Sequence, residues 1–161
     1  MERVKPSRPF TSPQKLFVDV NKKIKKFDLP LTDFDLINLH SMFMESTYSA
    51  FQASDINTGR IIIQKILNSL NYYHDAACLS TVKPVYFTNI DIFTIIQKYA
   101  QVYGLQHAIN QFFIEYAQID FIWIELTESL ISCLGQSNIN YFIKIMTQHR
   151  AIPVIIIEYN S

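Results

Sequence analysis

The spacing of apolar residues predicts alternating strands and helices along most of this chain. Some segments alternate apolar and polar residues or run through several β-branched residues, which is typical of buried strands. Others repeat apolar residues every three or four positions, which is typical of amphipathic helices. The predicted strands are residues 36–44, 76–81, 119–125 and 152–159, with a further extended piece at 84–88. The predicted helices are residues 14–27, 58–73, 91–103, 105–117 and 138–148.

This order of elements predicts an α/β fold with a mostly parallel sheet in three layers. Strands that alternate with helices need right-handed crossovers, which place the helices on the faces of the sheet. The polar run at residues 45–59 is interpreted as a connection, and Gly104 as the break between two helices. We find no internal repeat, and 161 residues suffice for one core. We therefore expect one α/β domain over residues 30–161, preceded by an arm over residues 1–29.

The arm differs from the rest of the chain in charge. Residues 1–26 contain eight Lys/Arg against two acidic residues, and the other 135 residues contain six Lys/Arg against twelve acidic residues. The zero net charge of the chain thus conceals a basic arm and an acidic body. The apolar stripe of the predicted arm helix consists of Leu16, Phe17, Val20, Ile24 and Phe27. This stripe either packs on the body or anchors a protein partner, and both interpretations rank above contact with anionic lipid or nucleic acid.

Residues 54–61 fill the place of a phosphate-binding loop of the pattern G-x-x-x-x-G-K-[ST]. Gly59 is the one position of that pattern that is kept, since Ser54 replaces the first glycine and Arg60 replaces the lysine. Ile61 replaces the hydroxyl that holds Mg²⁺, and an aliphatic side chain offers no oxygen ligand. We favour a plain turn and helix start here. The alternative is a relaxed nucleotide site, that is, one whose phosphate loop departs from the consensus pattern, in which Arg60 contacts phosphate and Thr58 supplies the hydroxyl.

From residue 30 onward the chain is similar to the core of RecA/KaiC-type P-loop ATPases. The segments that carry the resemblance are the strand at 36–44, the loop at 54–61, and the strands at 76–81, 119–125 and 152–159. The resemblance implies a truncated RecA-like sheet in which Glu125 stands where the family has its magnesium-organising acid, so a relaxed nucleotide site would include Glu125. The chain also resembles the regulatory pseudo-ATPase domain of the bacterial cellulose-secretion regulator. That likeness implies a non-catalytic partner protein.

Other candidate chemistry is sparse. Glu125 and Glu128 form either a general acid/base pair or, in the interpretation we favour, acids at a strand end and a helix start. Cys78 and Cys133 are isolated and are interpreted as core residues, as is Trp123. The four histidines lack the spacing of a helical zinc site, so we expect no metal, no cofactor and no catalytic residue.

The sequence therefore predicts a non-catalytic RecA-like protein, a pseudo-ATPase that serves as a protein-interaction or regulatory subunit and assembles with itself or a partner. The alternative is a nucleotide-binding switch or weak ATPase that uses Thr58, Gly59, Arg60 and Glu125. The sequence contains neither an apolar run of membrane-spanning length nor an apolar signal segment, so we expect a bacterial-type cytoplasmic location. An edge left free by a truncated sheet would be a further association site.

Overall fold

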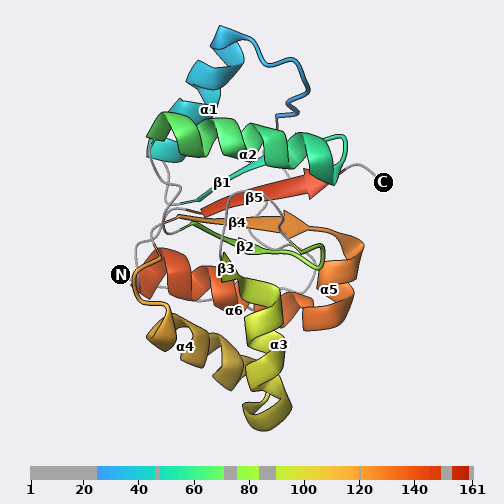
Figure 1. Ribbon diagram of the computed structural model, residues 1–161, viewed down its shortest axis with the longest axis vertical. Helices are drawn as coiled ribbons and strands as arrows, with labels where there is room; N and C mark the ends of the chain where they lie inside the picture. The colour runs from blue at the N-terminus through green and yellow to red at the C-terminus, as the bar shows by residue number, and fades with distance from the viewer. Residues whose placement is uncertain are drawn as a thin grey trace, which may run out of the picture.

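The sheet is the centre of the fold and is entirely parallel among the described residues (Figure 1). The computed structural model describes residues 25–45, 48–70, 76–83, 90–119, 121–149 and 154–159. Five strands lie in the order β1-β5-β4-β2-β3. Their bounds are β1 Tyr48–Ala53, β2 Ala76–Leu79, β3 Ile90–Asp91, β4 Phe121–Leu126 and β5 Val154–Tyr159. The predicted parallel α/β fold is confirmed, whereas its RecA-like and truncated character stays a prediction.

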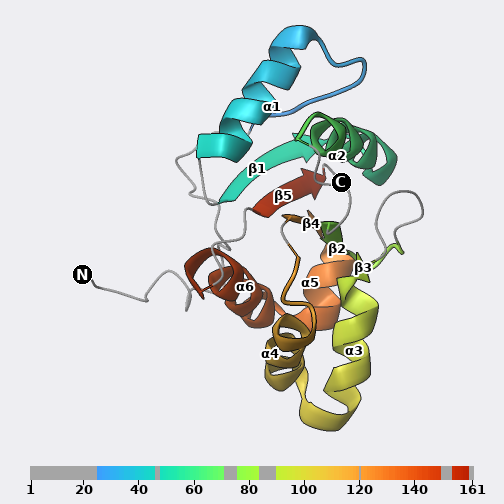
Figure 2. The ribbon, with the colours of Figure 1, turned by 60° about the vertical axis from the view of Figure 1, so that its left-hand side comes forward.

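Helices cover both faces of this sheet (Figures 1 and 2). Their bounds are α1 Asp33–Glu45, α2 Ile56–Leu70, α3 Ile92–Tyr103, α4 Leu105–Glu115, α5 Glu128–Leu134 and α6 Gln136–Lys144, which a π-helical turn, η2 Ile145–His149, extends. The stripe of α2 packs with alternate side chains of β1, β2, β4 and β5 in one core cluster. Helices α3 to α6 pack with the intervening strand side chains in a second cluster. This two-sided burial explains why the central strands are almost continuously apolar.

The prediction of a first strand at residues 36–44 was wrong, because these residues belong to α1. A capping box starts the helix: the Asp35 N–H donates to Thr32 Oγ1 at 3.0 Å, and the Thr32 N–H donates to Asp35 Oδ2 at 3.1 Å. Leu39 is then buried against the sheet while Ile37 stays exposed. Phe34 is exposed as well, so the apolar residues of this helix lie on more than one side of it, and their spacing alone did not distinguish a helix from a strand.

The first strand, β1, lies instead within the polar run that was predicted to be a connection. Its sequence is rich in Ala, Ser and Gln, which have weak strand preferences. Its whole length pairs in parallel with β5, from Tyr48 opposite Val154 to Ala53 opposite Tyr159. Pairing with a strand more than a hundred residues away makes β1 a strand, and a local pattern does not report such pairing.

Most of the other predicted elements agree with the structure to within a few residues, but the helix predicted at 14–27 does not include residues 25–27, which are extended, and its residues 14–24 lie outside the described residues. Helices predicted at 58–73, 91–103, 105–117 and 138–148 correspond to α2, α3, α4 and α6 with η2, and strands predicted at 76–81, 119–125 and 152–159 correspond to β2, β4 and β5. Gly104 ends α3 and has φ of 83°, a left-handed backbone that favours glycine. The extended piece at 84–88 lies outside the described residues.

The end of the predicted arm belongs to the body of the protein. The Phe27 N–H donates to the Gln52 carbonyl, and the Gln52 N–H donates to the Lys25 carbonyl, both at 2.9 Å, so residues 25–27 pair with the outer edge of β1. Phe27 is 2% exposed, and its ring meets Phe51 edge to face at 5.8 Å. Phe27, predicted as part of the partner anchor, is therefore a core residue.

The other four anchor residues, Leu16, Phe17, Val20 and Ile24, lie outside the described residues, as do residues 1–24 of the arm as a whole. The domain boundary at residues 29 and 30 stays a prediction, although Phe27 already packs with the body. None of the helices described here has the length and apolar character needed to cross a bilayer.

Candidate functional site

The candidate site lies at the carboxyl ends of β1, β5 and β4. Helix α2 follows β1 on one face of the sheet, whereas α5 follows β4 on the other face (Figure 1). In open α/β sheets the crevice at such a change of direction is where ligands bind. Residues 54–61, which comprise the two-residue connection after β1 and the first residues of α2, reach this edge, as does the predicted acid Glu125.

Strand periodicity decides which side chains face α2 at this edge. Successive residues of a strand point to opposite faces, so Trp123 and Glu125 share one face of β4, and Ile157 and Tyr159 share the same face of β5. Cys78 occupies the corresponding position on β2, directly opposite Trp123 in the register. Helix α2 contributes Arg60 from its first turns to the same region.

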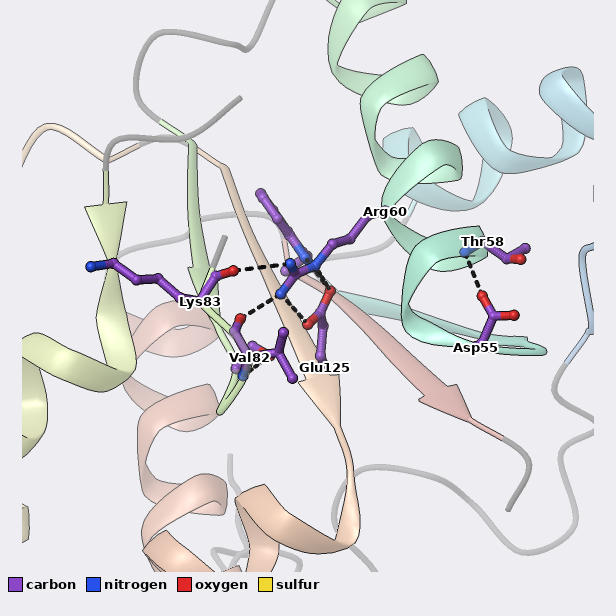
Figure 3. A network of polar contacts seen from close by, with 8 residues as sticks. Asp55, Thr58, Arg60, Val82, Lys83 and Glu125 are labelled. Atoms are coloured by element: carbon purple, nitrogen blue, oxygen red, sulfur yellow. Dashed lines mark hydrogen bonds and ion pairs between the residues drawn. The ribbon is translucent and has the colours of Figure 1, made fainter. Parts of the chain in front are cut away.

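Arg60 and Glu125 form a buried, two-pronged ion pair (Figure 3). Arg60 Nε donates to Glu125 Oε2 at 2.8 Å, and Arg60 Nη2 donates to Glu125 Oε1 at 2.8 Å. The guanidinium plane matches the two carboxylate oxygens, which is the strongest geometry for such a pair. Arg60 is 7% exposed and Glu125 is 0% exposed. The pair is therefore shielded from water.

Further contacts use most of the remaining hydrogen-bonding capacity of the pair (Figure 3). Arg60 Nη2 also donates to the Val82 carbonyl at 2.5 Å, and Nη1 donates to the Lys83 carbonyl at 3.2 Å. The indole Nε1 of Trp123 donates to Glu125 Oε2 at 3.3 Å. Burial opposes the charge on Arg60, but hydrogen bonding to Glu125 and its negative charge outweigh burial and raise the pKa of the guanidinium. Arg60 thus holds β4, α2 and the segment after β2 together.

The start of α2 carries its own carboxylate. Only Ser54 and Asp55 separate β1 from α2. The Thr58 N–H donates to Asp55 Oδ1 at 2.8 Å, and this backbone hydrogen bond is the main reason why the pKa of Asp55 is lowered. Asp28 adds a second carboxylate nearby, because it accepts a hydrogen bond from Ser54 Oγ at 2.6 Å. A carboxylate therefore occupies a position at the helix N-terminus that an open phosphate loop would leave to the ligand.

Gly59 is needed for the close approach of Tyr159. A Cβ atom built on Gly59 would lie 2.6 Å from the Tyr159 hydroxyl oxygen and 3.2 Å from its ring. The hydroxyl is buried and has no hydrogen-bond partner among the described residues. Burial, followed by the negative charge of Glu125, raises the pKa of this phenol. The one glycine kept from the phosphate-loop pattern therefore makes room for an aromatic side chain.

We expect Gly59→Ala to lower the free energy of unfolding by about 1–3 kcal/mol, because overpacking forces the Tyr159 ring to move. In a Tyr159→Phe background the same change should cost close to nothing, since the clashing oxygen is gone and alanine favours the helix by roughly 1 kcal/mol. Urea denaturation of the four proteins measures this coupling. If Gly59→Ala lowered the free energy of unfolding equally in the natural and Tyr159→Phe backgrounds, this would contradict the close approach of the Tyr159 hydroxyl to Gly59.

The structure brings together three of the four residues of the predicted nucleotide site. Gly59, Arg60 and Glu125 meet at the sheet edge, but Arg60 and Glu125 bind each other. Thr58 is partly exposed one residue before Gly59, with its backbone N–H bound to Asp55.

Glu128 was the other predicted acid, and Asp55 and Tyr159 were not predicted to belong to the site. Glu128 is exposed in the first turn of α5, on the opposite face of the sheet from Glu125, so the two acids do not form a pair. Sequence reasoning missed Asp55, although an aspartate just before a helix is a common N-cap signal. It also missed Tyr159, whose position depends on the register of β5 with β1 and β4.

The cysteines differ in their surroundings. Cys78 is buried as predicted, and burial followed by the charge of Glu125 holds the pKa of its thiol well above the usual range. Cys133 is exposed, so its interpretation as a core residue was wrong. Within the described ranges, no group of three or more His, Cys, Asp or Glu side chains is placed to hold a metal ion.

The Arg60–Glu125 pair is thus neutral as a whole, buried and largely satisfied, whereas Asp55 and Asp28 at the start of α2 are exposed carboxylates. Comparison of the chain with models of protein families, with curated protein sequences and with solved structures found no match.

Proposed function

We propose that this chain is a non-catalytic RecA-like protein, a pseudo-ATPase that acts as a protein-interaction or regulatory subunit. In this proposal the sheet edge that would bind nucleotide serves to stabilise the fold. The apolar stripe of the arm is the segment that binds protein.

The observation that carries the proposal is the pairing of Arg60 with Glu125. A phosphate loop needs a cation that is free to reach the outer phosphates, and a magnesium site needs a carboxylate that is free to order the metal and its waters. Here the two groups neutralise each other at 2.8 Å. Phosphate binding would require breaking a buried pair, which is costly because it leaves an uncompensated charge.

The start of α2 supports the same proposal independently. Asp55 accepts the Thr58 N–H, and Asp28 lies one hydrogen bond away through Ser54. Asp55 would repel a phosphate that approached the first turn of α2, and Asp28 would add to this although Lys26 Nζ lies 3.9 Å from its Oδ2. Ile61, which is part of α2, provides no oxygen ligand for Mg²⁺.

Calorimetric titration of the intact chain with Mg-ATP tests the proposal. We expect no saturable binding up to roughly millimolar concentration, which corresponds to less than about 4 kcal/mol of binding free energy. We also expect no release of phosphate above the blank over hours. The matched control is Thr58→Ala, which removes the one hydroxyl of the hypothetical nucleotide site and keeps the ion pair intact.

Saturable binding of Mg-ATP by the natural chain that weakens in Thr58→Ala would overturn the proposal. It would favour the alternative, a nucleotide-binding switch or weak ATPase that uses Thr58, Gly59, Arg60 and Glu125. Binding that is equal in both proteins would place nucleotide elsewhere and would also contradict the present proposal for the whole chain.

A further inference from the structure

An apolar surface lies over α1 and its junction with α2. Phe34 and Ile37 of α1 are 67% and 65% exposed, although each has a large apolar side chain. Beside them a groove of about 700 Å³ runs between α1 and α2, with Leu36 and Ile37 on its α1 wall. Figure 2 shows the two helices next to each other above the sheet. We call Phe34, Ile37 and this groove the α1 surface.

We propose that residues 14–24 of the same chain dock on the α1 surface as an amphipathic helix. These residues lie outside the described part of the chain, and the point where they join it is known. Lys25 follows them directly, and its Nζ lies 5.7 Å from the centre of the Phe34 ring. Residue 24 is therefore tethered at the border of the α1 surface.

The length of the segment fits this place. A helix rises 1.5 Å per residue, so residues 14–24 span about 16 Å and the thirteen residues of α1 span about 20 Å. The segment can thus lie along α1 without a spacer. Tethering by a short linker corresponds to an effective concentration in the millimolar range, which favours binding within one chain over binding to another copy.

Charge complementarity points to the same occupant. The first turn of α1 carries Asp33 and Asp35, and α1 contains no Lys or Arg. The segment and its two following residues carry five lysines against the single acid Asp19. Lys65, on the α2 wall of the groove, is the one cation among the groove residues. A basic helix is therefore best accommodated toward the α1 side.

The apolar pattern also matches. Leu16, Phe17, Val20 and Ile24 share one helical face, and such anchors are what a groove between two helices receives. The inference rests on the proposed function in one respect, the role of this stripe as a protein-binding segment. In the free chain the α1 surface covers the stripe, and a partner must displace it before binding. Docking within the chain thus regulates access to the arm.

A disulfide trap tests the inference. Val20→Cys and Ile37→Cys are introduced together with Cys133→Ser, because Cys133 is exposed and Cys78 is buried. Mild oxidation should give an intramolecular disulfide, seen as a faster band on a non-reducing gel with a monomeric mass by light scattering. An intermolecular disulfide would overturn the inference in favour of a second copy as occupant, and the absence of any disulfide would overturn it as well.

The matched control moves the second cysteine to the other side of the sheet. Ile114 on α4 is 70% exposed, similar to Ile37, and α4 packs on the opposite face from α1. The pair Val20→Cys and Ile114→Cys should form at most a trace of intramolecular disulfide. Equal yields for the two pairs would show random collision of the arm and would contradict docking on α1.

Proteolysis gives a second, independent readout. In Ile37→Asp we expect trypsin to cut at Lys22 and Lys23 on the order of tenfold faster, because cleavage follows the open population of the arm. Val102 on α3 is an apolar residue of similar exposure, and in Val102→Asp trypsin should cut the arm at the same rate as in the natural chain. Equal rates in both variants would contradict the docking. Both substitutions are at exposed sites and leave the core intact, and neither outcome depends on the Mg-ATP titration that tests the proposed function.

Discussion

Glu125→Ala should lower the free energy of unfolding by about 3–5 kcal/mol, the usual cost of removing one partner of a buried ion pair. The reason is that Arg60 would keep its charge at 7% exposure without its carboxylate. Trp123 Nε1 would lose an acceptor in the same step. Urea denaturation at neutral pH, with far-UV circular dichroism as the readout, measures the change.

The matched control for this prediction replaces both partners. Arg60→Met combined with Glu125→Leu removes both charges and keeps most of the apolar volume, and such replacements are often neutral or stabilising. The double variant should therefore be more stable than Glu125→Ala. A cost below about 1 kcal/mol for Glu125→Ala would be typical of an exposed pair and would contradict the buried geometry.

Phe27→Ala should lower the free energy of unfolding by a similar amount, about 3–5 kcal/mol, because a large buried aromatic ring is lost and a cavity remains. Phe27 is 2% exposed and packs edge to face on Phe51, beside the pairing of Lys25 and Gln52 with the edge of β1. Thermal and urea unfolding of the intact chain measure the change.

The control for Phe27 is Val20→Ala, five residues before Lys25, where the pairing with β1 begins. A stripe that docks on the surface contributes less than a core ring, so this variant should cost less than about 1 kcal/mol. Natural stability in Phe27→Ala would show that Phe27 belongs with the anchor stripe instead of the core. The same comparison guides the design of a truncation: removal of residues 1–24 keeps Phe27, whereas removal of residues 1–27 takes this core residue away.

The two predictions bear on function as well as stability. If the Arg60–Glu125 pair holds the sheet edge together, the residues that resemble a nucleotide site have a structural role that explains their presence. Because Phe27 is a core residue, the segment that binds protein in the proposed function ends before residue 25. The remaining stripe of Leu16, Phe17, Val20 and Ile24 is then the segment that partner binding and docking on the α1 surface must share.

The sequence by itself determined those elements in which the local pattern of apolar residues matches their burial in the folded protein. Strands β4 and β5 are buried on both faces, and their continuous apolar runs report this directly. Helix α2 buries one stripe, which the 3.6-residue period reports. That Ile61 offers no oxygen ligand to Mg²⁺ could also be predicted, because it follows from the side chain alone.

Only the tertiary structure decided the first strand and the site. Strand β1 exists because it pairs with β5. The apolar pattern of α1 fits two periods, and the local signal that favours a helix there is its capping box. Arg60 and Glu125 lie 65 positions apart in sequence, and their contact depends on the strand order that brings α2 over β4. Local periodicity reports which face of an element is buried, but it carries no information about which distant residue shares that face. That choice is made by the register and packing of the whole sheet.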